Sequence, residues 1–466
     1  MIHRLASPRK TAGARIVPPA SVLIFPMIPH PRRGSPLRPR LPALGIMLAL
    51  GLQATALAAP MAIDRIENEI VLHGRRNNQA WFEPAIGMIP GEAGQPPQVF
   101  IRATYLTGND VGPQFYLKTD NLGKTWTNPI LCQNWRKEPQ EENAFEEPWF
   151  GFLYHRKTGT FLALGNTHFV RDGGGNHFAS DHQPIDPNNK NEGHYRSAKL
   201  RGRIVLSRWN PAKNDFDPWE AVNLPPEPEL GIYYNAQFHE QPDGTILLPG
   251  YYRGALKPGE DPKHIRVTVL RFSFDGTKLT LLEHGNILAV DTNRGLAEPS
   301  LIAFGGKFFL TIRHDLRGYV ARSDDGLQFS EPTPWRFDDG EDLGNYNTQQ
   351  KWLKHRDTLY LVYNRKSELN DGVFRSRAPL FMAEVDPATL RVIRQTERIV
   401  FPQNGARMGN FNLVNVSDDE VWITSGEWLQ GKFAHSKKGD LFWVDRQDFN
   451  YIRYIGDLLL ARVYWK

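Results

Sequence analysis

The stretch EPSLIAFGGKFFLTIRHDLRGYVARSDDGLQF, residues 298–329, decides the fold. It holds two short apolar runs, residues 300–304 and 307–312, and a third run that ends in a Ser-Asp-Asp-Gly turn. Short runs rich in β-branched and aromatic residues, separated by glycine, predict consecutive β-strands. Glu298 precedes the first run and Arg313 ends the second, so we expect a carboxylate and a guanidinium at the ends of neighbouring strands.

The rest of the chain repeats this pattern. Apolar runs of 5–8 residues recur between segments rich in Gly, Pro, Asn and Asp. The runs outside the opening stretch are VFIRATYL, FLALGN, RIVLSRW, TILLPGYY, VTVLRFSF, LYLVYN, LFMAEVD, VWITSG and DLFWVD. Long amphipathic helical patterns are hard to find, which favours an all-β protein.

Turn motifs select the architecture. Residues 119–126, TDNLGKTW, match the Asp-box pattern Ser/Thr-x-Asp-x-Gly-x-Thr-Trp, with Asn121 in the Asp position. Shortened versions begin at Ser273 and Ser323. In this turn the Asp or Asn side chain binds nearby backbone amides, and glycine supplies a permissive dihedral. Repeated Asp boxes in a strand-rich chain predict a β-propeller, and the chain length suggests six or seven blades, with seven favoured.

An export leader is expected before the propeller. Residues 42–58 form an apolar run that follows several arginines and ends in Ala-Leu-Ala, which is typical of a signal peptide. We therefore predict a leader over residues 1–58, a single propeller domain over residues 59–466 and a periplasmic or extracellular location. The run is too short to span a bilayer.

Removing the leader changes the charge. Residues 1–58 carry eight Lys/Arg and no Asp/Glu, so the net charge falls from +5 for the whole chain to −3 for the remainder. This balance does not suggest nucleic acid as a partner. Cys132 is the single cysteine, which excludes an intramolecular disulfide. The sequence contains no firm cofactor or metal signature. A structural divalent cation in the channel is left as an open alternative.

Candidate site residues lie at the ends of predicted strands. His168 follows one strand, His194 lies after a Gly/Asn/His-rich loop, and Tyr234 and Arg253 follow in the next segments. Glu298, Arg313 and Arg377 form a later group, in which the arginines suit a sugar carboxylate. Asn345 and Gln349 lie in DLGNYNTQQKW, residues 342–352, and are suited to sugar hydroxyls.

Residues 82–427 resemble the sialidase-like propeller superfamily. Glu298 in EPSLI, Arg313 in TIRHD and Arg377 match that family's carboxylate and two of its three substrate-binding arginines. Two departures limit the likeness. Glu83 in WFEPAIGMIPG stands where the family has its first arginine, with Arg102 one strand too late, and ITSGEW lacks the tyrosine nucleophile that precedes Glu427.

The order of the other candidates is similar to that in ulvan lyases and in the lyases and rhamnosidases acting on rhamnose–glucuronate linkages. That resemblance implies β-elimination next to a uronate of an acidic glycan. Arg253 and Arg313 would bind the carboxylate, His194 or Tyr234 would take the C5 proton, and His168 would act as acid or orient the substrate. Tyr233 could take the place of Tyr234. Nearby arginines are expected to lower the pKa of the tyrosine.

Two alternatives accompany the lyase. A sialidase-like glycoside hydrolase, either an exo-sialidase or a rhamnosidase, would draw its carboxylates from Glu83, Glu298 and Glu427. A non-catalytic glycan-binding propeller would retain the arginines without the chemistry. All three interpretations share one partner, an acidic glycan that contains uronate or sialate.

Overall fold

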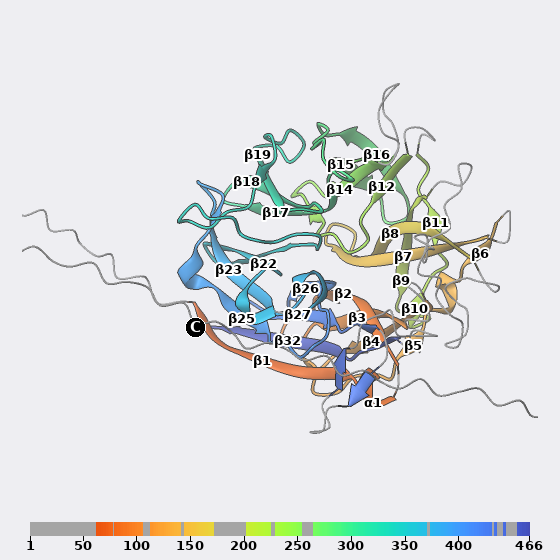
Figure 1. The fold of residues 1–466 in the computed structure, drawn as a ribbon. Coiled ribbons are helices and arrows are strands. Elements are labelled where there is room, and N and C mark those ends of the chain that lie inside the picture. Colours follow the sequence, from red (N-terminus) through yellow and green to blue (C-terminus); the bar gives the residue numbers. More distant parts are fainter. Residues whose placement is uncertain are drawn as a thin grey trace, which may run out of the picture. The chain divides into compact units, whose positions relative to one another are not determined.

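Six antiparallel sheets of four or more strands stand around a common centre in the described part of the chain (Figure 1). The structure is a computed structural model, and it describes residues 62–77, 79–105, 112–140, 144–171, 202–224, 229–253, 264–370, 373–430, 433–435, 441–443 and 454–466. The predicted leader lies outside these ranges. No helix within them is long and apolar enough to cross a membrane.

The first three sheets follow one another along the chain. The first contains β2 (Trp81–Ile89), β3 (Gln98–Tyr105), β4 (Gln114–Thr119) and β5 (Ile130–Leu131). The second contains β6 (Glu138–Pro139), β7 (Ala144–His155), β8 (Thr160–Arg171), β9 (Ile204–Asn210), β10 (Asp215–Phe216) and β11 (Glu220–Ala221). The third contains β12 (Glu229–Ile232), β13 (His239–Glu240), β14 (Ile246–Arg253), β15 (Ile265–Phe274) and β16 (Leu279–His284).

The remaining sheets complete the ring. The fourth contains β17 (Ala297–Phe304), β18 (Lys307–Arg313), β19 (Tyr319–Ser323) and β20 (Thr333–Pro334). The fifth contains β21 (Lys351–His355), β22 (Thr358–Tyr363), β23 (Leu380–Asp386), β24 (Arg391–Val392) and β25 (Arg398–Phe401). The sixth contains β26 (Phe411–Asn415), β27 (Glu420–Gly426), β32 (Leu458–Trp465) and β1 (Ile63–Leu72).

Short elements lie between these sheets. Two strand pairs join β28 (Leu429–Gln430) to β31 (Tyr454–Ile455) and β29 (Phe433–His435) to β30 (Leu441–Trp443). The described helices are α1 (Gly74–Asn77) and the single-turn 3-10 helices η1 (Gln133–Trp135), η3 (Glu368–Asn370), η4 (Phe374–Ser376) and η5 (Arg394–Thr396).

A separate hydrophobic cluster fills each interface between neighbouring sheets. Phe100 of the first sheet packs against Phe161 of the second, with ring centroids 4.9 Å apart. The sixth sheet packs back onto the first through Trp422 and Ile86. Because each sheet is covered on both faces, its central strands are continuous apolar runs, as in β22, rather than alternating ones.

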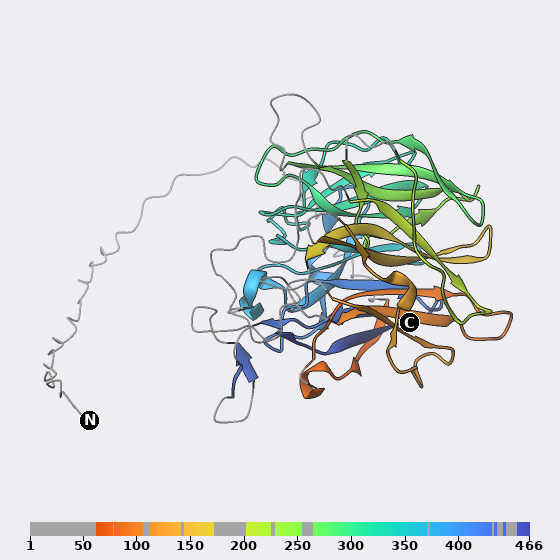
Figure 2. The same ribbon diagram turned by 90° about the vertical axis from the view of Figure 1, so that its right-hand side faces the viewer.

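The two ends of the propeller pair in one sheet, which closes the ring. β1 runs antiparallel to β32, with Ile66 opposite Val463 and Ile70 opposite Leu459. Figure 1 shows β1, orange, and β32, dark blue, side by side, and Figure 2 gives the same ribbon turned by 90°. The all-β propeller is therefore confirmed with six blades, and the preference for seven is wrong. Chain length overstated the count because long connections, such as residues 335–350 between β20 and β21, add residues without adding a sheet.

The Asp boxes form the expected turns. Asn121 Oδ1 accepts a hydrogen bond from the Thr125 amide at 3.0 Å, and Thr119 Oγ1 accepts one from the Gly123 amide at 3.0 Å. In the turn after β19, Asp325 Oδ1 accepts from the amides of Leu327 and Gln328. These side chains satisfy amides that the strands leave unpaired, so they fasten the hairpins.

Candidate functional site

Strained backbone marks the start of three inner strands. Glu83 in β2, Glu298 in β17 and Asn347 before β21 have φ values of 50°, 46° and 49°. Glu83 and Glu298 lie at irregularities in strand pairing, and each is followed by proline. A positive φ in a residue other than glycine costs about 1–3 kcal/mol and concentrates at functional sites. The strain therefore points to these inner-strand ends, where the first strands of different blades approach one another.

Two arginines meet at Asn347. Arg313 at the end of β18 forms an ion pair with Glu298 through Nη1 and donates from Nη2 to Asn347 Oδ1 at 2.5 Å. Arg377 donates from Nη2 to the Asn347 carbonyl oxygen at 2.8 Å. The structure thus brings together Glu298, Arg313 and Arg377, as the sequence predicted.

The two arginines are largely buried, and Glu298 is the carboxylate that acts on both of them. The Arg313 and Glu298 side chains are 11% and 21% exposed, so the pair lies at the edge of solvent. Burial, with Arg313 and Arg375 nearby, lowers the pKa of Arg377 to about 9. Gly409 makes room for this guanidinium stem, since a Cβ there would lie 2.3 Å from Arg377 Cδ. Neither Nε has a hydrogen-bond partner among the described residues, which leaves donors for an anion.

Tyr233 and Tyr234, which follow β12 in the third blade, lie near this group, and Glu298 and Arg313 both act on the Tyr233 hydroxyl. Both tyrosines are buried, their ring centroids are 5.0 Å apart, and the Glu83 carboxylate acts on the Tyr234 hydroxyl. Asn410 donates to Glu83 Oε1 at 2.7 Å. Gly151 of β7 permits this approach, because a Cβ there would lie 1.9 Å from the Tyr234 carbonyl oxygen. A tyrosine and a glutamate from different blades are thus coupled.

The tyrosine is a phenol, contrary to expectation. Burial and the Glu83 carboxylate raise the pKa of Tyr234 well above its usual value, and these effects outweigh Arg102, which acts in the opposite direction. Arg102 reaches this point from β3, donates to the Glu83 carbonyl oxygen at 2.8 Å and lies 5.3 Å from the Tyr234 ring centre. The expected lowering of the tyrosine pKa is therefore wrong, because desolvation dominates.

His168 lies beside this group. It is opposite Glu147 in the pairing of β7 with β8. Its ring centroid is 4.8 Å from that of Trp149 and 6.4 Å from that of Tyr234. The structure therefore places His168 and Tyr234 close together. His194 lies outside the described residues, and of Arg253 only the backbone at the end of β14 is described.

Asn345 and Gln349 are fully buried. Gln349 donates to the Phe411 carbonyl oxygen at 2.9 Å and accepts a long hydrogen bond from Asn235 at 3.4 Å, so it links inner strands. Asn345 accepts from the Gly318 amide through its backbone carbonyl oxygen at 3.0 Å and through its side-chain oxygen at 3.4 Å. Both buried residues therefore have structural contacts, and Asn347 of the same segment is the one that binds the arginines.

Glu427 belongs to a structural joint. Arg75 of α1 donates to both of its carboxylate oxygens, at 2.7 and 3.0 Å, Asn404 donates to one, and the Asp457 amide donates to the other at 3.0 Å. The Glu427 side chain is 2% exposed. With its lone pairs occupied in this way, Glu427 holds the first helix against the sixth blade.

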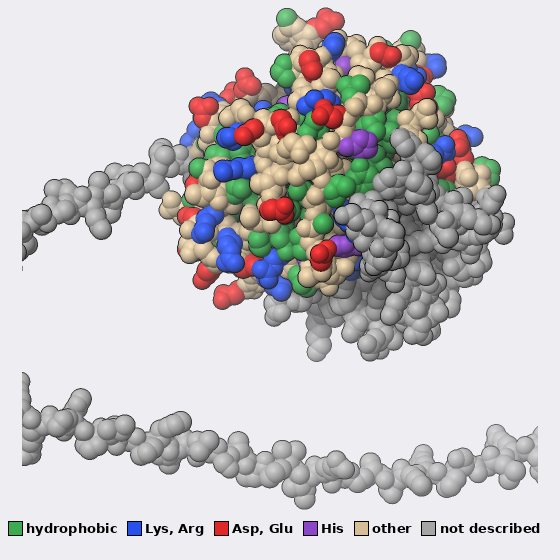
Figure 3. All heavy atoms as spheres, turned by 90° about the horizontal axis from the view of Figure 1, so that it is seen from above, with side chains coloured by type: hydrophobic (Ala, Val, Ile, Leu, Met, Phe, Trp, Pro, Cys, Tyr) green, Lys and Arg blue, Asp and Glu red, His purple; other side chains and the backbone are tan. Residues whose placement is uncertain are grey.

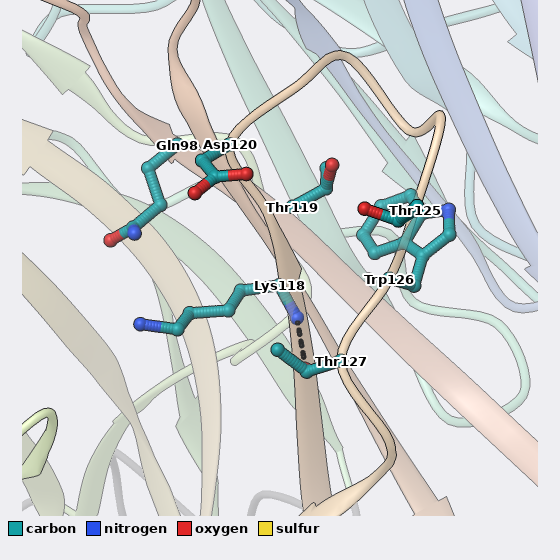
Figure 4. Close-up of a pocket in the computed structure, with 7 residues that line it drawn as sticks. All are labelled: Gln98, Lys118, Thr119, Asp120, Thr125, Trp126 and Thr127. Atoms are coloured by element: carbon teal, nitrogen blue, oxygen red, sulfur yellow. Dashed lines mark hydrogen bonds between the residues drawn. The ribbon is translucent and has the colours of Figure 1, made fainter.

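Other parts of the described surface offer less chemistry. No group of three or more His, Cys, Asp or Glu side chains among the described residues could hold a metal ion. Acidic and basic side chains are interspersed on the face in Figure 3. A hollow beside the first Asp box, shown in Figure 4, is lined by Gln98, Lys118, Thr119, Asp120, Thr125, Trp126 and Thr127. The Lys118 amide donates to Thr127 Oγ1 there at 3.0 Å, as part of the hairpin.

One site residue escaped the sequence analysis altogether. Lys351 opens β21, is fully buried, and has its Nζ 5.7 Å from the Tyr233 ring centre. Glu-Pro marks Glu83 in β2, Glu147 in β7 and Glu298 in β17, but it also occurs at three other places in the chain, so it does not locate the site by itself. Nothing in the sequence pairs Lys351 with that site.

Comparison with known proteins identifies the fold class. No protein-family model and no curated protein matches the chain. The solved structure of the NanB sialidase from Streptococcus pneumoniae in complex with 2-[(3-chlorobenzyl)ammonio]ethanesulfonate matches with a TM-score of 0.53 and 11% identity, over 87% of this chain and 71% of that one. The chain therefore has the sialidase-like β-propeller fold.

A second solved structure aligns less closely. The Trypanosoma rangeli sialidase in complex with sialic acid is 12% identical, with a TM-score of 0.49. That match covers 85% of this chain, and this chain spans 58% of the Trypanosoma rangeli protein.

Proposed function

We propose that this chain is a glycoside hydrolase that cleaves an acidic glycan next to a carboxylate-bearing sugar. The observation that carries the proposal is the meeting of Arg313 and Arg377 at Asn347, where three inner strands have strained residues near their starts. Guanidiniums with unused N–H groups in a partly desolvated site are suited to a planar carboxylate. The sialidase-like fold agrees with this chemistry.

The tyrosine–glutamate pair supplies a nucleophile. Sialidases are known exceptions to two-carboxylate hydrolysis because they use tyrosine. Here the Tyr234 hydroxyl would pass its proton to Glu83, and its oxygen would attack the anomeric carbon as the glycosidic bond breaks and the leaving oxygen takes a proton from water. The resulting hydroxide would displace the sugar from Tyr234, which would regain its proton from Glu83. A base is needed because the resting side chain is the phenol. This pair would replace the tyrosine missing before Glu427.

Direct assay tests the proposal. Purified protein is incubated with sialosides and with glucuronate-containing glycans, and released sugar is measured. We expect release from an acidic glycan and none from its carboxyl-reduced counterpart, since the arginines would lose their anion. Release of neutral sugars at equal rates would overturn the proposal.

Elimination is the second candidate, on one observation. His168 and Tyr234 lie together, with ring centroids 6.4 Å apart, and such a pair could exchange the protons that β-elimination needs. The phenol form of Tyr234 makes it a better acid than base. Ultraviolet absorbance of the product decides, because only a lyase makes an unsaturated uronate.

Export is part of the proposal. It rests on the apolar run and small-residue end of residues 1–58. Expression of the full chain in a Gram-negative host, followed by N-terminal sequencing of the periplasmic protein, tests it. We expect a new N-terminus near residue 59, and an intact cytoplasmic chain would contradict export.

A further inference from the structure

Lys351 is a buried amine without a hydrogen-bond partner. Its side chain has no exposed surface, and its Nζ makes no hydrogen bond to any described residue. A buried polar group left unsatisfied costs about 1–3 kcal/mol, and more if it is charged. Such a group in a native structure needs an explanation, and a catalytic role or a bound partner is one.

The surroundings of Lys351 belong to the candidate site. Tyr233, which follows β12, presents its ring to Nζ, and Glu298 of β17 is the carboxylate that acts on the amine. Arg313 and Arg377 both bind Asn347, four residues earlier in the chain. The amine therefore lies near the carboxylate that Arg313 also binds.

The charge of Lys351 depends on what occupies the site. Burial lowers its pKa to about 7, and the Glu298 carboxylate opposes this shift without cancelling it. At slightly alkaline pH the amine is therefore largely neutral. A ligand carboxylate placed near it would favour the ammonium form and raise the pKa again.

We propose that Lys351 completes the carboxylate-binding site and takes up one proton from solvent when an acidic sugar binds. The inference rests on the proposed function. The neutral amine and a solvent proton give an ammonium ion, which pairs with the incoming carboxylate and balances its negative charge. The affinity for an acidic sugar therefore depends on pH.

Calorimetry measures the proton directly. N-acetylneuraminic acid and glucuronic acid are titrated into the protein at about pH 8 in two buffers of different protonation enthalpy, which yields the number of protons taken up. For the wild type we expect about one proton per ligand bound. Lys351→Met should bind at least tenfold more weakly without uptake, and Lys351→Arg should bind without uptake because its charge is permanent.

Lys354→Met is the matched control. Lys354 lies on the same strand but is exposed, so this variant should behave as the wild type does. Equal affinity and equal proton uptake in wild type and Lys351→Met would overturn the role of Lys351 while leaving acidic-sugar binding intact. Failure of both acids to bind the folded wild type would overturn the carboxylate site and this inference together.

Discussion

Asn347 binds Arg377 through its backbone carbonyl oxygen and Arg313 through its side chain, while its own φ is positive. One strained residue thus holds two guanidiniums in place. The strain suggests that Asn347 serves to position the two guanidiniums rather than to stabilise the fold.

Asn347→Gly separates these two effects. Glycine adopts the positive φ at no steric cost, so we expect stability to stay level or rise by up to about 1 kcal/mol, while Arg313 loses a partner and KM rises. Urea unfolding and steady-state kinetics measure both. Asn293→Gly, at a position with φ of 50°, is the control and should leave KM unchanged.

Arg313→Lys tests the carboxylate role. Lysine keeps the charge but cannot hold Glu298 and Asn347 with a planar fork, so we expect KM to rise by about 10- to 100-fold. The control is Arg271→Lys, in an ion pair with Glu283 at 2.9 Å on the outer strands of the third blade. Matching kinetics in both variants would exclude Arg313 from substrate binding.

Tyr234→Phe removes the proposed nucleophile while keeping the ring. Turnover should fall by at least about 10³-fold, with binding of an acidic sugar largely retained. Tyr252→Phe is the comparison, since that hydroxyl binds His284 Nδ1 at 2.7 Å between outer strands. A near-normal kcat in Tyr234→Phe would show that another group is the nucleophile.

Sequence patterns revealed the propeller because its signals are local. Asp-box turns and apolar strands depend on neighbouring residues, and Glu298 and Arg313 lie on adjacent strands of one blade. The site joins blades that are distant in sequence, so contacts such as Tyr234 with Glu83 could not be read from spacing. Burial of Tyr234 and Lys351, which sets their protonation, also depends on packing between blades.

Lys351→Met should change how stability depends on pH. The pKa of Lys351 is about 7 in the folded protein and 10.5 ordinarily, so between these values the unfolded chain binds the extra proton. Wild-type stability therefore rises as pH increases from 7 towards 10.5, and the cost of burying the charge is fully present below pH 7. Lys351→Met does not bear this cost, because its side chain has no charge to bury.

Urea unfolding at pH 6 and at pH 9 measures the difference. We expect Lys351→Met to be the more stable protein at pH 6 and to lose much of that advantage by pH 9. Lys354→Met serves as the exposed control and should track the wild type at both values. An advantage independent of pH would mean that Lys351 does not titrate in this range.

Arg75→Ala tests whether Glu427 is structural. Removing Arg75 leaves the Glu427 carboxylate, 2% exposed, with only the Asn404 side chain and the Asp457 amide, and breaking such a buried pair costs about 3 kcal/mol. We expect a lower midpoint of urea unfolding but normal kcat for the folded fraction, because the joint fastens α1 to the sixth blade. A loss of kcat with unchanged stability would instead place Glu427 in the catalytic machinery.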